Sequence, residues 1–251
     1  MSKSRYVVGL RSVEQLIDSP AAEIRKIYTE YQTANPRVEA LIVKANMKGI
    51  ELQQANRARL TQIGGEARHQ GVIAEIHGSS VMDEASLRTN IEAQLMDEKA
   101  SPPLLMILDG IQDPHNLGAC LRTADAAGVD AVIVPRHGAA GLGPTVSKVA
   151  AGAAEVLPFV SVPVMSKVFS WLRDYKIRLV GTSDAAETSI FEADLTVPLA
   201  LVMGREGSGL RPQVADSCDE LVSLPMHGAV SSLNVSVAAG ICLYEAVRQR
   251  R

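Results

Sequence analysis

Six short, continuous apolar runs in the second half of the chain constrain its fold more than any other feature. They are 104-LLMIL-108, 131-AVIVP-135, 156-VLPFV-160, 177-IRLVG-181, 198-PLALVMG-204 and 221-LVSLP-225. Helical patterns lie between them, as at 117–128 and 166–175, and a further helical segment covers 232–251. Runs without polar alternation are typical of strands buried on both faces. This half of the chain therefore predicts a parallel sheet with helices on both of its faces.

The first part of the chain indicates a separate, small α/β domain over residues 1–76. Short strand-like and helical runs alternate there, at 6–10, 11–18, 24–30, 37–49, 50–54 and 72–76. Within 68-RHQGV-72, we interpret His69 as a turn residue before the closing strand. Residues 77–103 are acidic and end in a Pro-Pro pair, which disfavours helix just before it. We interpret them as a linker that carries one modest helix.

Charge and cysteine usage limit the classes of function. The net charge of −3 argues weakly against a nucleic-acid partner, but residues 1–75 carry +3, so that segment is the better candidate for RNA. The three cysteines lack metal-ligand spacing, and we expect neither a metal site nor disulfides. The apolar runs fall short of the ~20 residues of a membrane helix, and no basic-then-apolar leader is present. We expect a cytoplasmic protein with no membrane partner.

Common nucleotide-binding fingerprints are missing from the turns that follow the apolar runs. The first such turn, 109-DGIQDPHNLG-118, has no G-x-G-x-x-G. The glycine-rich stretch 204-GREGSGLRP-212 lacks the Lys-Ser/Thr of a phosphate-binding loop. A dinucleotide-dependent oxidoreductase and an ATP-binding protein are both disfavoured.

Three other stretches bring polar residues to the ends of apolar runs, where open α/β sheets bind ligands. They are 116-NLGACLR-122, 203-MGREGSG-209 and 224-LPMHGAVSSLNVS-236. Taken singly, each has a structural explanation. Asn116 would be a helix N-cap, Glu206 a solvated turn residue, and Asn234 with Ser232 the cap of the last helix.

Together, these stretches resemble the three motifs of the SpoU (TrmH-like) 2′-O-ribose methyltransferases of the SPOUT class. The matching patterns are N-x-G-x-x-x-R, M-G-x-E-G-x-G and S-L-P-M…S-S-L-N-V-S-V-A, and the resemblance covers residues 104–251. Two runs, D-P-H-N-L-G-A-C-L-R and C-D-E-L-V-S-L-P-M, are similar to the members that methylate a guanosine ribose in 23S ribosomal RNA. The H-Q-G-V at 69–72 is similar to the amino-terminal domain of those enzymes.

The resemblance implies properties that the residue patterns do not. It implies S-adenosyl-L-methionine as cofactor, 23S ribosomal RNA or a precursor of the large ribosomal subunit as partner, and no metal. It implies that the second domain is a SPOUT domain with a deep trefoil knot, against the general rule that chains are unknotted. The first domain would be a ribosomal-protein-like RNA-binding domain. The chain would form a homodimer with the active site at the subunit interface.

Candidate site residues follow from motif positions. The cofactor-binding candidates are Gly204, Leu224, Leu233, Thr182, Met203 and Met226, and the catalytic candidates are Arg122, Asn116, Glu206, Asn234 and Ser232. A guanidinium suits a phosphate and stays protonated near neutral pH, so anchoring the target nucleotide is the more natural role for Arg122 than general-base catalysis. Asn116 would orient Arg122 or contact the nucleotide.

Two alternatives keep the same fold. One is a transfer-RNA guanosine-2′-O-methyltransferase, which differs only in its substrate. The other is a catalytically idle RNA-binding or assembly factor.

Overall fold

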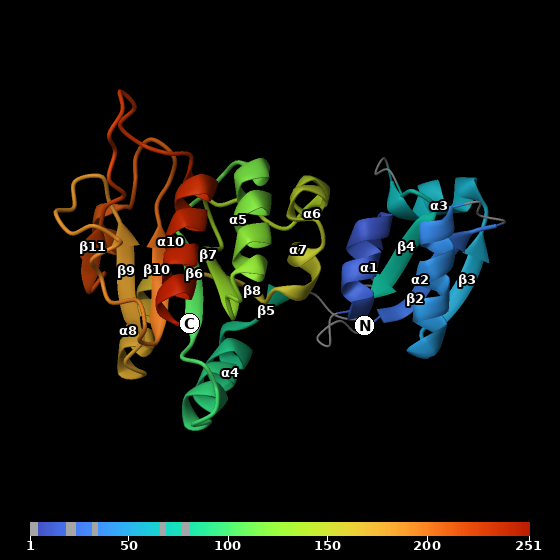
Figure 1. Ribbon diagram of the computed structural model, residues 1–251, viewed down its shortest axis with the longest axis horizontal. Coiled ribbons are helices and arrows are strands. Elements are labelled where there is room, and N and C mark those ends of the chain that lie inside the picture. Colours follow the sequence, from blue (N-terminus) through green and yellow to red (C-terminus); the bar gives the residue numbers. More distant parts are fainter. Residues whose placement is uncertain (1–4, 19–23, 32–34, 66–68, 77–80) are drawn as a thin grey trace. The chain divides into compact units, whose positions relative to one another are not determined.

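The computed structural model describes residues 5–18, 24–31, 35–65, 69–76 and 81–251 (Figure 1). Its contacts divide the chain into two compact units. The first comprises residues 1–80 and 151–156, and the second comprises residues 81–150 and 157–251.

The first unit is a mixed four-stranded sheet with helices. Its sheet has the order β1-β4-β2-β3, in which β4 runs antiparallel to both β1 and β2, and β3 runs parallel to β2. Its elements are β1 (Arg5–Val8), α1 (Leu10–Asp18), β2 (Ile24–Glu30), α2 (Pro36–Met47), β3 (Glu51–Ala55), α3 (Arg57–Gly64) and β4 (Val72–Ile76). The apolar faces of α1 and α2 pack on the sheet around buried residues such as Val13, Leu16 and Leu41. The first unit therefore has a hydrophobic core of its own.

Local signals explain the element ends in this unit. Asn35 caps α2 by accepting a hydrogen bond from the amide of Arg37, and Pro36 takes the first helical position, where no amide donor is needed. His69 lies in the turn before β4, as interpreted from the sequence. The amide of Gly71 donates to its Nδ1 at 3.1 Å, and Thr61 Oγ1 lies 3.3 Å from its Nε2.

The second unit contains a seven-stranded sheet in which every neighbouring pair is parallel, so the predicted parallel sheet is confirmed. The strand order is β11-β9-β10-β6-β7-β8-β5. The strands are β5 (Val81–Met82), β6 (Leu104–Leu108), β7 (Ala131–Pro135), β8 (Phe159–Val162), β9 (Arg178–Thr182), β10 (Leu199–Met203) and β11 (Glu220–Val222). The helices are α4 (Glu84–Met96), α5 (Pro114–Ala126), α6 (Pro144–Ala150), α8 (Met165–Asp174), α9 (Pro212–Ala215) and α10 (Val235–Gln249); α7 (Ala153–Val156) belongs to the first unit.

Helices cover both faces of this sheet. Leu105 and Ile107 of β6 pack in one cluster with residues of α4 and α8. Because side chains alternate along a strand, Leu104, Met106 and Leu108, which are also buried, point to the opposite face. There α5 and α10 lie side by side (Figure 1). The five residues of β6 are thus all buried, which explains the continuous apolar run at 104–108.

The segment 77–103, interpreted as a linker, contributes a strand and a helix to the second unit. β5 pairs in parallel with β8 at the edge of the sheet, and Leu87 and Ile91 of α4 are buried in the core. Only these two side chains of α4 are buried, in a helix with polar residues on its other sides. Because only two apolar side chains of α4 are buried, its acidic sequence did not predict that this helix packs on the sheet.

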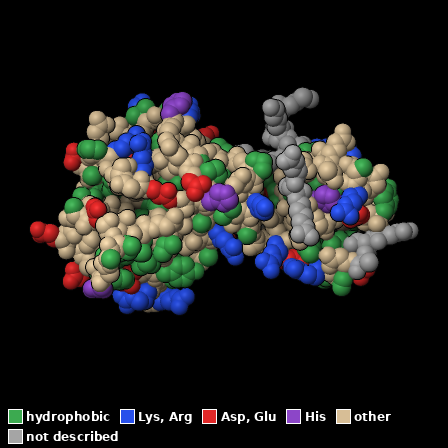
Figure 2. Space-filling view, turned by 90° about the horizontal axis from the view of Figure 1, so that it is seen from above, with side chains coloured by type: hydrophobic (Ala, Val, Ile, Leu, Met, Phe, Trp, Pro, Cys, Tyr) green, Lys and Arg blue, Asp and Glu red, His purple; other side chains and the backbone are tan. Residues whose placement is uncertain are grey.

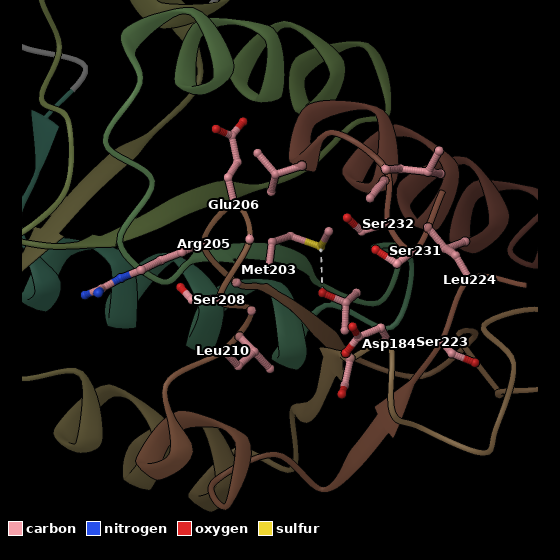
Figure 3. Close-up of a pocket in the computed structure, with 18 of the residues that line it drawn as sticks. Asp184, Met203, Arg205, Glu206, Ser208, Leu210, Ser223, Leu224, Ser231 and Ser232 are labelled. Atoms are coloured by element: carbon pink, nitrogen blue, oxygen red, sulfur yellow. Dashed lines mark hydrogen bonds between the residues drawn. The ribbon is translucent and has the colours of Figure 1, made fainter. Parts of the chain in front are cut away.

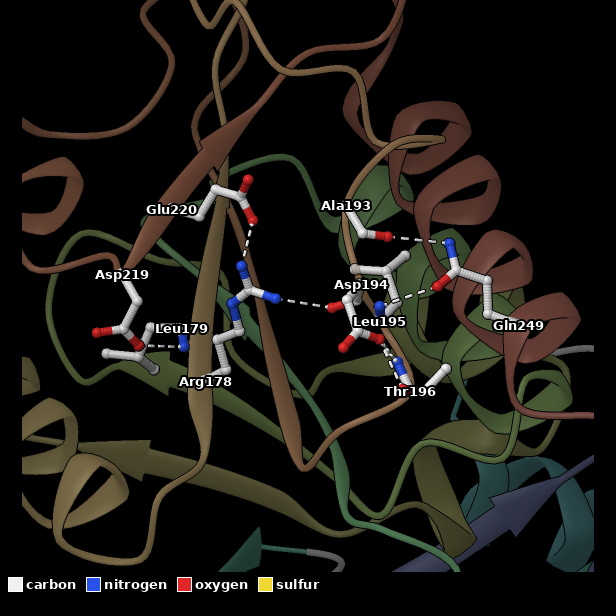
Figure 4. Close-up of polar contacts among 9 residues, drawn as sticks. All are labelled: Arg178, Leu179, Ala193, Asp194, Leu195, Thr196, Asp219, Glu220 and Gln249. Carbon is white, nitrogen blue, oxygen red and sulfur yellow. Dashed lines mark hydrogen bonds and ion pairs between the residues drawn. The ribbon is translucent and has the colours of Figure 1, made fainter.

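Polar contacts tie the last helix and the edge strand to the amino end of β9 (Figure 4). Arg178 donates to the Asp194 carbonyl at 2.9 Å and to the Glu220 carboxylate at 2.7 Å. Gln249 of α10 accepts from the Leu195 amide at 2.9 Å and donates to the Ala193 carbonyl at 3.1 Å. These contacts fix the positions of β11 and α10. The segment after β11 and the segment before α10 form part of the candidate site, which lies at the other end of the strands.

Candidate functional site

A cavity of about 670 Å³ lies at the carboxyl ends of β9, β10 and β11 (Figure 3). Its walls come from four segments, the turn after β9, the loop after β10, the segment after β11 and the start of α10. Eight of the eleven candidate residues line it: Thr182, Met203, Gly204, Glu206, Leu224, Met226, Ser232 and Leu233. The loops that carry the second and third motifs are therefore parts of one cavity wall.

The loop after β10 is closed tightly, and Gly204 allows this. The amide of Arg205 donates to the carbonyl of Gly209 at 2.9 Å, and the amide of Gly209 donates back at 3.0 Å. A Cβ atom on Gly204 would lie 2.3 Å from the carbonyl carbon of Gly209 and 2.4 Å from the nitrogen of Leu210. A side chain at position 204 is thus incompatible with this backbone crossing.

Three catalytic candidates from three different segments meet in one polar cluster. Asn234 donates to the side-chain oxygen of Asn116 at 2.9 Å and to the Glu206 carboxylate at 3.2 Å. Asn116 also donates to Glu206. The cluster joins the start of α5, the loop after β10 and the start of α10, and its member Glu206 lines the cavity.

The helix-cap explanation holds for Asn234 but not for Asn116. Asn234 is the N-cap of α10, with its side-chain oxygen accepting from the amide of Ser236. Asn116 is not a cap, because Asp113 caps α5 through the amide of His115. Asn116 instead lies in the first turn, where its side chain is 8 % exposed and reaches the other two members of the cluster. Ser232 precedes the cap and faces the cavity.

Arg122 lies apart from this cluster. Six residues turn an α-helix by about 600°, so Asn116 and Arg122 point to different sides of α5. Asn116 is buried and Arg122 is exposed. The expectation that Asn116 orients Arg122 therefore fails within one chain: Asn116 bonds to Asn234 and Glu206 instead. Arg122 is not among the residues that line the cavity within the described parts of the chain.

Sequence reasoning missed a buried ion pair beneath the site. Asp109 follows β6 directly, and its side chain is 0 % exposed. Its carboxylate accepts from Arg211 Nε at 2.9 Å and from the Arg211 amide at 3.2 Å. This bond to Asp109 raises the pKa of the Arg211 guanidinium. The pair holds the loop after β10 against the loop that leads into α5, and an acid placed directly after an apolar run was its only signal.

The cavity also contains polar groups that were not among the candidate residues. Ser183 and Asp184 follow β9 outside the motifs, whereas Ser223 and Ser231 belong to the third motif (Figure 3). Cys120 lies below Glu206, and burial, followed by the charge of Glu206, raises the pKa of its thiol to about 12. That thiol is therefore a structural group and not a nucleophile at neutral pH.

The described residues contain neither a metal-binding cluster nor a membrane-spanning helix. No three His, Cys, Asp or Glu side chains among them lie close enough together to hold a metal ion. None of the helices in the part of the chain that the structure describes has the length and hydrophobicity to cross a membrane.

Comparison with known families assigns a class to this fold and site. Residues 103–244 match the model of the SpoU rRNA Methylase family. Residues 6–82 match the model described as RNA 2′-O ribose methyltransferase substrate binding. The first match covers more than half of the chain. The chain belongs to the SpoU rRNA methylase family.

Relatives of known function match along the whole length of the chain. The 23S rRNA (guanosine-2′-O-)-methyltransferase RlmB of Ralstonia nicotianae is 44 % identical over 250 residues, which cover 100 % of this chain and 98 % of the relative. The enzyme of the same name from Pseudomonas putida is 45 % identical over 251 residues, with 100 % and 99 % covered. Among solved structures, the SpoU methyltransferase AviRb from Streptomyces viridochromogenes in complex with the cofactor AdoMet has a TM-score of 0.76 and 27 % identity, over 98 % of this chain and 90 % of that chain.

Proposed function

We propose that this protein methylates the 2′-oxygen of a guanosine ribose in 23S ribosomal RNA, with S-adenosyl-L-methionine as the methyl donor. One observation carries the proposal: Asn116, Glu206 and Asn234, one from each motif, are joined by hydrogen bonds at the edge of a cavity. The relatives named for this reaction, about 44 % identical over the full length, support the choice of substrate.

The cavity suits the proposed cofactor. Its volume of about 670 Å³ lies in the range of small-molecule sites. Met203, Leu224, Met226 and Leu233 offer apolar surface for the adenine ring. The Asp184 carboxylate and the hydroxyls of the neighbouring serines offer partners for the ribose hydroxyls and the amino group. When bound, S-adenosylmethionine supplies an electrophilic methyl group on its sulfonium. This reaction requires no Lewis acid.

The polar cluster and Arg122 would act on the RNA. The mutual bonds of Asn116, Glu206 and Asn234 restrict their rotamers, so that they would hold the ribose in a fixed orientation beside the cavity. Ser232 would contact the cofactor or the ribose. We assign to Arg122 the anchoring of the target nucleotide's phosphate through its planar fork of N–H donors.

We also propose a homodimer, because Arg122, which does not line the cavity of its own chain, could then reach the cavity of the partner subunit. The exposed side of α10 carries apolar side chains: Val237 and Tyr244, seven residues and about two turns apart, are 51 % and 50 % exposed. This helix packs on α5 where Gly240 approaches Thr123, the neighbour of Arg122. A second copy that covered this surface would receive Arg122 from its partner, close to its own cavity.

The first unit is proposed to bind RNA. Its helix α3 begins with Arg57 and Arg59, which are exposed, and neither has an ion pair among the residues that the structure describes. Figure 2 shows Lys and Arg side chains on the surface of the first unit. The match to a substrate-binding family over residues 6–82 supports this role. Because the substrate is ribosomal RNA, the cytoplasm is the proposed location.

The trefoil knot belongs to the same proposal. Its support is the membership of the SpoU family. The domain limits that we propose are 1–76 for RNA binding, 77–103 for the connection and 104–251 for the methyltransferase, with β5 and α4 of the connection packed on the methyltransferase sheet.

The central test measures transfer of a labelled methyl group from S-adenosylmethionine to 23S ribosomal RNA. We expect wild-type protein to label the RNA at a guanosine 2′-oxygen, and Arg122→Ala to lower kcat/KM at least about a hundredfold. Arg122→Lys should recover only part of the loss, since an ammonium lacks the planar fork. Lys167→Ala, an exposed cation on α8, is the control and should keep full activity. Wild-type activity in both Arg122 variants would contradict the assignment.

Mixing two inactive variants tests whether Arg122 acts on the partner's site. A dimer of one Arg122→Ala subunit and one Glu206→Gln subunit would contain one site with both groups intact if Arg122 acts across the interface. We expect activity to reappear on mixing, up to half of the wild-type activity per mixed dimer. If the mixture stays inactive although light scattering shows mixed dimers, Arg122 acts within its own subunit.

A further inference from the structure

Arg205, between the glycine and the glutamate of the second motif, has an unusual environment. Its Nε atom is buried and has no hydrogen-bond partner among the described residues. No hydrogen bond or ion pair of its other guanidinium nitrogens is found there either, although its backbone is fixed by two hydrogen bonds to Gly209. Leaving a buried donor unpaired costs stability. Because Nε is closed to solvent, a partner from outside the chain would bond to the two terminal nitrogens of this half-buried side chain.

The charges around Arg205 are already engaged with other groups. Asp109 pairs with Arg211 and lies fully buried beneath the loop. Glu206, the next residue, accepts hydrogen bonds from Asn116 and Asn234. The two arginines of this loop thus differ: Arg211 forms an ion pair with Asp109, whereas Arg205 has no acidic partner among the described residues.

The fold makes specific room for the Arg205 guanidinium. It lies against Gly110, where a Cβ atom would be 2.7 Å from Nε and 3.2 Å from Nη2. Gly110 has a φ of +89°, which favours glycine independently of this contact. In Figure 3 the Arg205 side chain points away from Asp184, Leu224 and Ser232, that is, away from the far wall of the cavity. Its contact is with Gly110, in the segment between β6 and α5.

Exposed basic residues lie in a neighbouring loop, and exposed Asp113 lies in the segment after Gly110. The loop after β7 approaches the same segment, since the amide of Ala140 donates to the carbonyl of Ile111 at 2.7 Å. That loop contributes Arg136 and His137, both exposed. An extended anionic chain that passed over Gly110 would therefore meet Arg205, and the loop that carries Arg136 and His137 lies along the same segment.

We infer that Arg205 binds a backbone phosphate of the RNA substrate next to the target nucleotide, and so positions the ribose beside the cluster formed by Asn116, Glu206 and Asn234. The inference rests on the proposed function. Its ligand chemistry is an anionic oxygen held by a guanidinium, for which a fork of parallel N–H donors is suited. The cofactor's carboxylate has the same chemistry. We favour the phosphate because the side chain is directed away from Asp184 and towards the segment before Asn116.

The test compares wild type with Arg205→Gln, Arg205→Lys and the control Lys176→Gln. Lys176 is an exposed cation in the turn before β9, at the end of that strand opposite the cavity. For each protein, the KM for a 23S ribosomal RNA fragment is measured over a range of salt concentrations. Calorimetry gives the affinity for S-adenosylhomocysteine, and circular dichroism verifies folding.

We expect Arg205→Gln to raise the KM for RNA about tenfold at low salt, and to reduce the slope of log KM against log salt by about one, because one phosphate contact is lost. Cofactor affinity should stay within about twofold. Arg205→Lys should keep the salt slope and raise KM less, because it keeps the charge without the fork. Lys176→Gln should match wild type in KM and in slope.

Two results would overturn the inference. An unchanged salt slope in Arg205→Gln would show that no phosphate contact was lost. A fall in cofactor affinity, with RNA affinity unchanged, would assign Arg205 to the cofactor's carboxylate. Failure of the proposed function is distinguishable, since it would appear as a lack of RNA methylation in the wild type. The salt slope of direct RNA binding, measured with wild type and Arg205→Gln, would then still decide the role of Arg205.

Discussion

Replacing Gly204 by alanine tests whether the tight crossing after β10 builds the cavity wall. The new Cβ atom would lie 2.3, 2.4 and 2.6 Å from three backbone atoms of Gly209 and Leu210. Backbone atoms held by the reciprocal Arg205–Gly209 hydrogen bonds cannot rotate away as a side-chain tip can, so the loop has to move as a whole. The clash therefore belongs at the upper end of overpacking costs, about 3 kcal/mol.

A smaller opposing effect reduces this cost. Alanine restricts the unfolded chain more than glycine does, which stabilises the folded state by up to about 1 kcal/mol where the backbone conformation suits it. The net loss is then about 2 kcal/mol. For a unit of this size, it corresponds to a melting temperature lowered by about 4 to 8 °C. Because the moved loop forms part of the cavity wall, affinity for S-adenosylhomocysteine should fall at least about tenfold.

Two other glycines make the comparison quantitative. A Cβ on Gly181 would lie 2.7 Å from Cys218 Sγ and 2.8 Å from a Leu210 methyl carbon, which are side-chain atoms that can shift, so Gly181→Ala should cost about 1 kcal/mol. Gly228 has nothing within 4 Å of its Cβ position, and Gly228→Ala should be neutral. Differential scanning calorimetry and cofactor titration measure all three. If Gly204→Ala melts and binds like Gly228→Ala, the crossing does not shape the site.

Two further predictions follow from pKa values. Burial raises the pKa of Cys120, Cys218 and Cys242 to about 12. At mildly alkaline pH, a thiol-specific disulfide reagent should therefore react on the order of a thousandfold more slowly with native than with denatured protein. Equal reaction rates, followed by absorbance, would refute this. Burial, together with a hydrogen bond to Glu75, raises the pKa of Tyr28 to about 12 from 10.0, so the neutral phenol stabilises the first unit fully below pH 10 and loses this effect as the pH rises towards 12. Tyr28→Phe should therefore flatten the pH dependence of hydrogen exchange in β2 and β4 over that interval, and an identical pH dependence in the two proteins would contradict the pKa shift.

The sequence predicted the architecture of the second unit well because its strands are buried on both faces. Continuous apolar runs such as 104–108 and 198–204 leave little choice of structure, and both became central strands. The run 156–160 was less informative. Val156 is the last residue of α7, and β8 begins only at Phe159, just after Pro158. An apolar run alone does not distinguish the end of a buried helix from the start of a strand. The short edge strand β5 left no signal at all.

The candidate site was predictable in its membership but not in its contacts. The motifs pointed to Asn116, Glu206 and Asn234, yet only the fold brings residues 90 and 118 positions apart into hydrogen-bond contact. The Asp109–Arg211 pair and the unpaired nitrogen of Arg205 depend on which atoms face each other across two loops. Residue identity and spacing carry no such information. The same holds for Arg122, whose exposure follows from the way α5 packs.

The strand order has a consequence for the synthesis of this protein. The central strand β6 pairs on one side with β7, which follows soon after it, but on the other side with β10, which begins about 95 residues later. At roughly 5 to 20 residues per second, a growing chain would hold one unpaired edge in the middle of its sheet for roughly 5 to 20 s. Asn234, which completes the polar cluster, is made later still. Until Asn234 has been synthesised, the methyltransferase unit has a nascent sheet and no assembled site.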